Sequence, residues 1–188
     1  MKRFLRSKRG LGTPVANLIV LTAAVLLSIT VTVFAMNVTT SQVQRENLYV
    51  ATSHVWYTNS SCSVAGIAVT NTGPTDVVLS RITVKGFQCA WNNSENFVVY
   101  CKINQSLPGD LLYVKDLTNA GNNTITVGNE PFVFTVAEEG LTLKSGWTMM
   151  FYMVIPDRIM VYDLGQPIRI VISTTQAVYC TETNVQTV

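Results

Sequence analysis

The sequence predicts an α+β protein: one long hydrophobic α-helix followed by an immunoglobulin-like antiparallel β-sandwich. Five of the first ten residues are basic, and no charged residue occurs between Gly10 and Arg45. From Cys62 onward the pattern changes to short runs rich in Val, Ile, Thr and aromatic residues, with Gly, Pro and Asn turns between them. The 188 residues suffice for one such domain besides the helix.

The uncharged stretch Leu11–Met36 is long enough to cross a hydrocarbon core of about 30 Å as a helix. A charged side chain within that core would be costly, so the absence of charge is informative. The basic flank predicts that residues 1–10 stay in the cytoplasm and that everything after Met36 lies outside.

Three ways of processing this stretch are open. A secretory signal could be cut after Val33-Phe34-Ala35, although the apolar run exceeds the usual core of about 7–15 residues. An uncut stretch would serve as a membrane anchor. A cut between Gly10 and Leu11 would remove the basic residues and keep the apolar helix.

The cluster that ends in Lys8-Arg9-Gly10, directly before the apolar stretch, resembles the class III signal peptide of type IV pilins and archaellins. The resemblance implies that a membrane-embedded prepilin peptidase recognises Lys8 and Arg9 and cuts after Gly10, which makes Leu11 the mature N-terminus. Bacterial members usually carry glutamate at the fifth mature position, where this chain has Val15. Archaeal members generally lack that acid, so the resemblance points to an archaeal type IV pilin or archaellin.

Later motifs extend the resemblance over most of the chain. The Asn71-Thr72-Gly73 turn, followed by a β-rich run that leads to Gly86, looks like a feature of archaeal pilin-like domains. The turn at Leu143–Gly146 and the closing run Ser173–Tyr179 are similar to the ends of those domains.

We predict that the helix begins at Thr13-Pro14 and runs to about Thr52, roughly 58 Å at 1.5 Å per residue. Threonine can cap the first turn, and proline at the first helical position has no amide to leave unpaired. Ser and Thr hydroxyls within the stretch can bond to the preceding turn. The predicted domains are a removed leader at residues 1–10, the hydrophobic helix at 11–53 and an extracellular β-sandwich at 54–188.

The strands are predicted from alternating or β-rich runs bounded by turn residues. They are 64–71, 77–85, 96–103, 111–115, 124–127, 132–136, 148–155, 168–174 and 177–181.

Composition argues against nucleic-acid binding. The chain has 13 Lys and Arg against 11 Asp and Glu, and removal of the five basic leader residues leaves 8 against 11. A mildly acidic mature protein lacks the basic surface that nucleic acid requires.

The residues also suggest no enzyme and no cofactor. The only histidine, His54, has no recognisable nucleophile motif near it, and we interpret it as a residue of the helix–domain junction. The Glu138-Glu139 pair before Gly140 reads as a solvated turn. Asp110, Asp157 and Asp163 are scattered, so a structural calcium site is only an alternative, and we expect no metal.

Four cysteines in an exported domain suggest two disulfides. Of the three pairings we favour Cys89–Cys101, which would close the turn at residues 90–96, and Cys62–Cys180, which would tie an early strand to the last one. Free buried thiols are the alternative.

Five sequons satisfy Asn-x-Ser/Thr. They begin at Asn37, Asn59, Asn92, Asn104 and Asn122. We expect some of them to carry glycans, and Asn37 least, because a packed helix bundle leaves little space for a sugar.

The resemblance implies a subunit that polymerises through its helix into a homo-oligomeric filament for adhesion or surface attachment. Such a subunit is held in the cytoplasmic membrane before assembly and lies in a cell-surface filament afterwards. An assembly ATPase and a membrane platform would be its partners besides the peptidase. An archaellin or other motility-filament component is one alternative, and a membrane-anchored surface-layer or ligand-binding β-sandwich protein is another.

Overall fold

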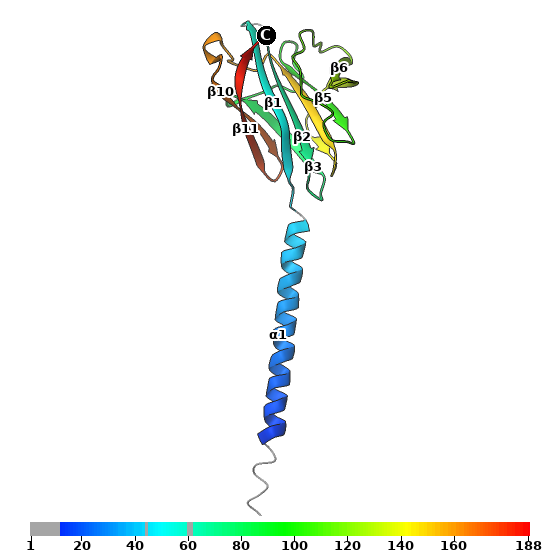
Figure 1. Ribbon diagram of the computed structural model, residues 1–188, viewed down its shortest axis with the longest axis vertical. Coiled ribbons are helices and arrows are strands. Elements are labelled where there is room, and N and C mark those ends of the chain that lie inside the picture. Colours follow the sequence, from blue (N-terminus) through cyan, green and yellow to red (C-terminus); the bar gives the residue numbers. More distant parts are fainter. Residues whose placement is uncertain (1–11, 44, 60–61) are drawn as a thin grey trace, which may run out of the picture. The chain divides into compact units, whose positions relative to one another are not determined.

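The computed structural model describes residues 12–43, 45–59 and 62–188. These form two compact units, the helix and a β-domain that begins at Arg45 (Figure 1). The elements in chain order are α1 Gly12–Val43, β1 Leu48–Asn59, β2 Cys62–Asn71, β3 Val77–Val84, β4 Phe87–Gln88, β5 Phe97–Ile103, β6 Asn123–Val127, β7 Glu130–Val136, β8 Leu141–Leu143, β9 Thr148–Val154, the 3-10 helix η1 Val161–Asp163, β10 Pro167–Thr174 and β11 Val178–Thr187.

Helix α1 is 32 residues long, which corresponds to about 48 Å at 1.5 Å per residue. Its segment Gly12–Ser41 is long and apolar enough to cross a membrane. The predicted back-bonding is confirmed at Thr22, Thr30 and Thr32, whose hydroxyls donate to backbone carbonyls three or four residues earlier. These side chains therefore add no unpaired donor to an apolar environment.

The predicted end of the helix near Thr52 is wrong. The helix ends at Val43, and residues 48–53, expected within it, form the first half of β1. Leu48 is buried and Tyr49 exposed, as in a strand with one covered face. The segment before β1 is also bonded to the domain, since the Asn47 carbonyl accepts from the amides of Thr72 and Gly73.

The strands form one continuous sheet in the order β4-β3-β10-β11-β1-β2-β9-β5-β7-β6, with β8 paired to β3. All strand pairs are antiparallel except β1–β11, in which Val55 lies opposite Val185. The predicted immunoglobulin-like sandwich of two separate sheets is not what this topology shows. Eight of the nine predicted β-rich runs form strands, and the run at 111–115 does not. The runs carried no information about whether one sheet or two would form.

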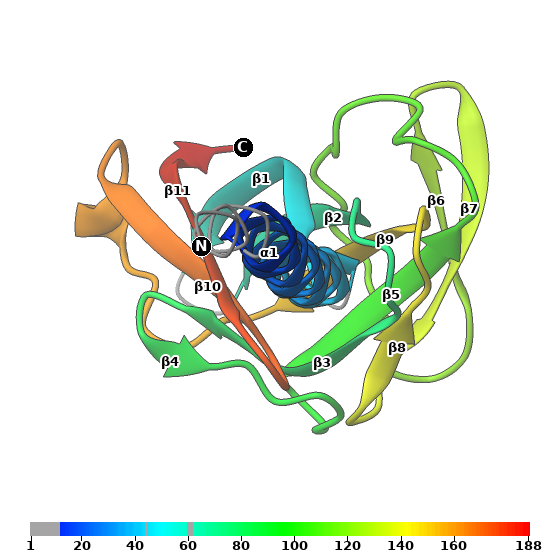
Figure 2. The same ribbon diagram turned by 90° about the horizontal axis from the view of Figure 1, so that it is seen from below.

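The sheet curls around its main core. In Figure 2, β4 and β10 lie at one side of the domain and β6 and β7 at the other. Side chains from β3, β8 and β10 pack with side chains from β1, β2, β9 and β5 in one buried cluster. A second cluster lies on the opposite face of β1, β2, β9 and β5, where β6, β7 and part of residues 107–117 cover it. Both faces of β2 and β9 are thus buried.

Two of the turns that resembled pilin-like domains are in contact. The buried Asn71 side chain donates to the carbonyls of Thr75 (2.7 Å) and Leu143 (3.1 Å) and accepts from the amide of Gly73 (3.0 Å). The Ser145 hydroxyl donates to the Gly73 carbonyl at 2.6 Å. Asn71 therefore links the turn after β2 to β8 by hydrogen bonds. The same turn is bonded to Asn47, in the segment that precedes β1.

Replacement of Asn71 by Ala should lower the free energy of unfolding of the β-domain by about 1–3 kcal/mol, because the Thr75 and Leu143 carbonyls lose the Asn71 donor, whereas the Gly73 amide keeps its bond to the Asn47 carbonyl. Asn71→Asp should also lower the free energy of unfolding, because a carboxylate oxygen would face the Thr75 and Leu143 carbonyls and could donate to neither. Trp fluorescence during thermal unfolding in micelles reports on this domain, because Trp56, Trp91 and Trp147 all belong to it. Asn184→Ala, at an exposed position of β11, is the matched control. Equal stability of all four proteins would contradict this role of Asn71.

Candidate functional site

Strand β1 changes the face on which its side chains lie. Tyr49 pairs with Thr70 and Thr52 pairs with Ala68, so Ala51 is an extra residue between them. A bulge of this kind re-aims the side chains that follow it. Tyr49 consequently projects from the same face of the sheet as Thr52 and His54, although in an unbroken strand it would lie on the opposite face.

A loop between β5 and β6 crosses this face and is held there. Leu111 is buried in the second core cluster, and the Tyr152 hydroxyl donates to the Leu112 carbonyl at 2.9 Å. Gly109 lies so close to Gly128 that a Cβ on Gly109 would be 2.7 Å from the Gly128 Cα. The strand predicted at residues 111–115 does not form, and this segment serves instead to carry Asp110 to β1.

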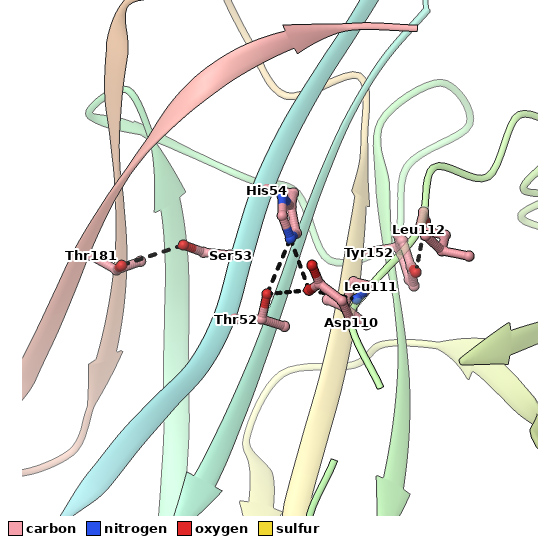
Figure 3. Close-up of polar contacts among 8 residues, drawn as sticks. All are labelled: Thr52, Ser53, His54, Asp110, Leu111, Leu112, Tyr152 and Thr181. Atoms are coloured by element: carbon pink, nitrogen blue, oxygen red, sulfur yellow. Dashed lines mark hydrogen bonds and ion pairs between the residues drawn. The ribbon is translucent and has the colours of Figure 1, made fainter. Parts of the chain in front are cut away.

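Asp110, Thr52 and His54 form one hydrogen-bonded cluster (Figure 3). The Asp110 Oδ1 atom accepts from the Thr52 hydroxyl at 2.5 Å and pairs with His54 Nε2 at 2.9 Å. The amide of Leu111 donates to the same oxygen at 2.9 Å. No residue that the structure describes donates to Asp110 Oδ2, and the side chain is 60% exposed. One carboxylate oxygen is therefore fixed by the protein, and the other is open.

The net effect of these contacts is to lower the pKa of Asp110 below its ordinary value. Burial is the largest single influence and acts in the opposite direction, because it disfavours the charged carboxylate. Hydrogen bonds from Thr52 and His54 and the charge of His54 together outweigh it. Asp110 is thus an ionised acceptor at neutral pH.

An aromatic stack supports the cluster. The His54 ring lies 5.3 Å from that of Trp56, and Trp56 lies 6.3 Å from Tyr152, with nearly parallel planes in both pairs. Gly66, opposite His54 on β2, leaves room for the indole, since a Cβ there would come within 3.0 Å of it. The side chain of His54 is 19% exposed, so its position is set by packing as well as by hydrogen bonds.

This cluster differs from a proton relay. A relay needs the two imidazole nitrogens to face different partners, one the acid and one the nucleophile. Here Thr52 and Asp110 both contact Nε2, while Nδ1 is buried with no hydrogen-bond partner among the described residues. The arrangement orients a carboxylate and leaves the Thr52 hydroxyl bonded to that carboxylate.

A cleft of about 600 Å³ lies beside the cluster. Its described lining consists of Tyr49, Ala51, Thr52, Thr70, Ser106, Leu107, Gly109 and Asp110. This volume falls within the range of about 300–1,000 Å³ typical of small-molecule sites. The open oxygen of Asp110 thus belongs to a residue on the wall of a cleft of ligand size.

The remaining carboxylates do not gather. Asp163 pairs with Lys85 at 2.7 Å, and Asp157 accepts from Asn96 at 3.3 Å. Within the described part of the chain no group of three or more potential metal ligands occurs. Glu138 and Glu139 are exposed before the turn at Gly140, as predicted.

The residues of the predicted cut, Lys8, Arg9, Gly10 and Leu11, lie outside the described residues. The five sequon asparagines, Asn37, Asn59, Asn92, Asn104 and Asn122, all have exposed side chains. A bulky glycan requires an exposed asparagine, and all five meet this condition. Glycan attachment at each position stays a prediction.

Neither predicted disulfide is present, because Cys89, Cys101 and Cys180 carry free thiols. Cys89 belongs to the main core, whereas Cys101 packs against the second core on the other side of the sheet. Burial raises the pKa of the Cys89 thiol to about 12. The predicted closure of the turn at residues 90–96 by a Cys89–Cys101 disulfide is therefore wrong.

The Cys62–Cys180 pairing conflicts with the strand register. Thr181 contacts Ser53, whereas Cys62 pairs with Asn59 six positions farther along β1. At about 3.3 Å per residue this separation is roughly 20 Å, against about 4.4–6.8 Å between the Cα atoms of a disulfide. The last strand, β11, does lie beside an early one, β1. However, Cys180 lies near the first half of β1, and Cys62 lies beside its last residue.

Tyr49 was not predicted as a site residue, and Asp110 was named only in the alternative of a structural calcium site. Tyr49 was assigned to the helix, and Asp110 reaches Thr52 across 58 positions of the chain. The one local signal is the alternation of apolar and polar residues from Leu48, which favours a strand.

Asp110→Asn should lower the melting temperature of the β-domain at pH 6 by about 1–3 °C, corresponding to at most about 1 kcal/mol, because solvent screens a carboxylate whose side chain is 60% exposed. Because the folded pKa is depressed, the stabilisation is present above the ordinary value of 3.8 and is lost as the pH falls through the lower folded pKa. The difference between wild type and variant should therefore shrink below pH 4. Asp116→Asn, at an exposed position of the same loop, is the control. A difference that stays constant from pH 6 to pH 2.5 would argue against this linkage.

No protein-family model and no curated protein matches this chain. Its architecture, a long apolar N-terminal helix followed by a large mixed β-sheet, is pilin-like.

Proposed function

We propose that this chain is a structural subunit of an archaeal type IV pilus-like filament that polymerises through its N-terminal helix and serves adhesion. A prepilin peptidase would cut after Gly10, and α1 would hold the subunit in the cytoplasmic membrane until assembly. An assembly ATPase and a membrane platform would then transfer it into a cell-surface filament.

The observation that carries this proposal is the surface of α1. Leu18, Ile19, Val20 and Leu21 follow one another, and at 100° per residue four consecutive positions point to all sides of a helix. A helix that is apolar all round requires burial in a membrane or among other helices. The apolar side chains concerned are Val15, Leu18, Ile19, Val20, Leu21, Val25, Leu26, Leu27, Ile29, Val31, Val33, Phe34, Met36 and Val38.

The energetics suit storage in lipid followed by transfer into a bundle. At about 1.5–3 kcal/mol each, these side chains represent tens of kcal/mol of gross burial. Lipid already provides most of that burial, so the net gain on bundling is smaller and extraction has to be driven. The β-domain has its own two core clusters and does not need α1 to complete them.

Two alternatives share features with this proposal, and a specific observation favours the second. An archaellin or other motility-filament component would share the leader and the helix. A membrane-anchored ligand-binding protein would use α1 as an anchor only, and the cleft beside Asp110 favours it.

Processing discriminates the filament proposals from the anchor. Mass spectrometry of surface-sheared material should find a peptide that begins at Leu11, and electron microscopy should find filaments that disappear when this chain is deleted. Gly10→Val should abolish both the cut and the filaments, while Gly12→Ala, two residues beyond, should preserve them, since a Cβ on Gly12 meets nothing within 4 Å. A mature chain that retains Met1 would rule out the pilin and archaellin proposals alike. Loss of swimming with adhesion intact would favour the archaellin.

A charge within α1 tests the role of its surface. Val25→Glu should prevent filament formation, because a charged side chain at the centre of a membrane helix costs about 2.5–3.5 kcal/mol and has no partner in a bundle of apolar helices. Val133→Glu in β7 is the matched control, since Val25 and Val133 are each 51% exposed. Filaments of normal yield from Val25→Glu would contradict a helical core built from α1.

A further inference from the structure

We propose that the cleft between β1 and the loop carrying Asp110 binds a neutral saccharide. The biological purpose of this binding rests on the adhesive role proposed above, and the inference adds to that role the class of ligand. Binding itself needs only the folded β-domain and would occur in a single subunit as in a filament.

The lining combines the groups that a sugar ring requires. The Ser106 hydroxyl can donate to or accept from sugar hydroxyls. The Thr52 hydroxyl donates to Asp110 and can still accept, and the Thr70 hydroxyl shares a hydrogen bond with that of Thr148. Ala51 and Gly109 add small surfaces that allow close approach. Polar side chains beside the apolar surfaces of Tyr49, Ala51 and Leu107 suit a ligand that has both hydroxyl groups and apolar C–H faces.

Tyr49 supplies the aromatic surface. It lines the cleft with 62% of its area exposed, so its ring is accessible to a ligand. The face of a phenol ring is apolar and its hydroxyl is polar, so the ring can pack against the C–H face of a sugar while the hydroxyl bonds to it. The bulge at Ala51 is what turns this ring toward the same side as Thr52 and Asp110.

Asp110 supplies the orienting acceptor. Its Oδ1 atom is occupied by Thr52, His54 and the Leu111 amide, whereas no described residue donates to Oδ2 (Figure 3). A carboxylate oxygen accepts strong, charge-assisted hydrogen bonds from hydroxyl groups. His54 acts as a positioning residue, since it contacts Asp110 and does not line the cleft.

The same residues disfavour other ligand classes. None of the described lining residues is cationic, and Asp110 would repel an anion. One carboxylate does not provide the six to eight oxygen ligands that Ca²⁺ takes. Glycoside hydrolysis by the usual route needs a second carboxyl group, and the described lining has one. The cleft is therefore suited to binding a neutral sugar without cleaving it.

The saccharide could come from two sources. One is a glycan of another cell or surface. The other is the chain's own glycan at Asn104, because Ser106 is the third residue of that sequon and also lines the cleft. Both sources present the same chemistry to Tyr49 and Asp110.

The test uses the full chain, produced without glycosylation and held in micelles of a detergent that has no sugar headgroup. The probes are free tetrasaccharides of glucose, mannose and galactose, with trigalacturonate as the anionic comparison, and binding is measured by saturation-transfer NMR and titration. We expect at least one neutral tetrasaccharide to bind, and both Tyr49→Ala and Asp110→Asn to weaken it at least fivefold.

Two substitutions are matched controls: Tyr162→Ala removes an exposed tyrosine far along the chain, and Asp116→Asn removes an exposed carboxylate of the same loop. Neither should change the affinity. Because Tyr49 is exposed, Tyr49→Ala should leave the domain folded, so its result stands even if Asp110→Asn lowers stability. The proposal is overturned if no neutral probe binds, if trigalacturonate binds equally well, or if both site variants keep the wild-type affinity.

A second arm separates the two sources. In chain purified from its own cells, tighter binding after Asn104→Gln would assign the cleft to the chain's own glycan, and unchanged binding would assign it to an external saccharide. Failure of filament assembly would leave the micelle measurement intact, so the proposed function and this inference can fail separately.

Discussion

The two-sided pairing of β1 is the constraint on which the rest of the β-domain depends. It is bonded antiparallel to β2 on one side and parallel to β11 on the other, and this joins the β3–β10–β11 part of the sheet to the β2–β9–β5 part. Its residue Val55 lies in the main core and Trp56 in the second. A strand with both edges paired and both faces used cannot shift its register without moving a full set of side chains to the wrong face.

The bulge at Ala51 is a local exception within this constrained strand. It leaves Val55 and Trp56 in their respective cores while bringing Tyr49 to the face that carries Thr52 and His54. The loop with Asp110 then completes the cleft, and it is fixed by Leu111, by Tyr152 and by the Gly109–Gly128 approach. The open oxygen of Asp110 thus lies on a rigid support, which limits the ordering cost of binding.

Much of the secondary structure followed from local pattern. The strand at Thr148–Val154 was predicted almost residue for residue, because Thr-Met-Met-Phe-Tyr-Met-Val is a continuous apolar run between a Ser-Gly turn and a proline. Leu48–Ser53 was assigned to the helix because Leu48, Val50 and Ala51 fit either period over so short a window. Leu111–Lys115 has strand-like composition but is anchored by Leu111 and by the Leu112 carbonyl. Long-range contacts decided both cases.

The sequence by itself determined that α1 is a charge-free helix of membrane length, that a β-rich domain follows, and that a turn containing Gly73 follows the strand ending at Asn71. These are consequences of composition and of short-range backbone preference. Only the tertiary structure decided that the strands form one curled sheet, that the cysteines lie on different faces and strand ends, and that Asp110 meets Thr52 and His54. Each of these depends on which strands pair and in which register. That choice is made by the burial of side chains far apart in the chain, which no local pattern encodes.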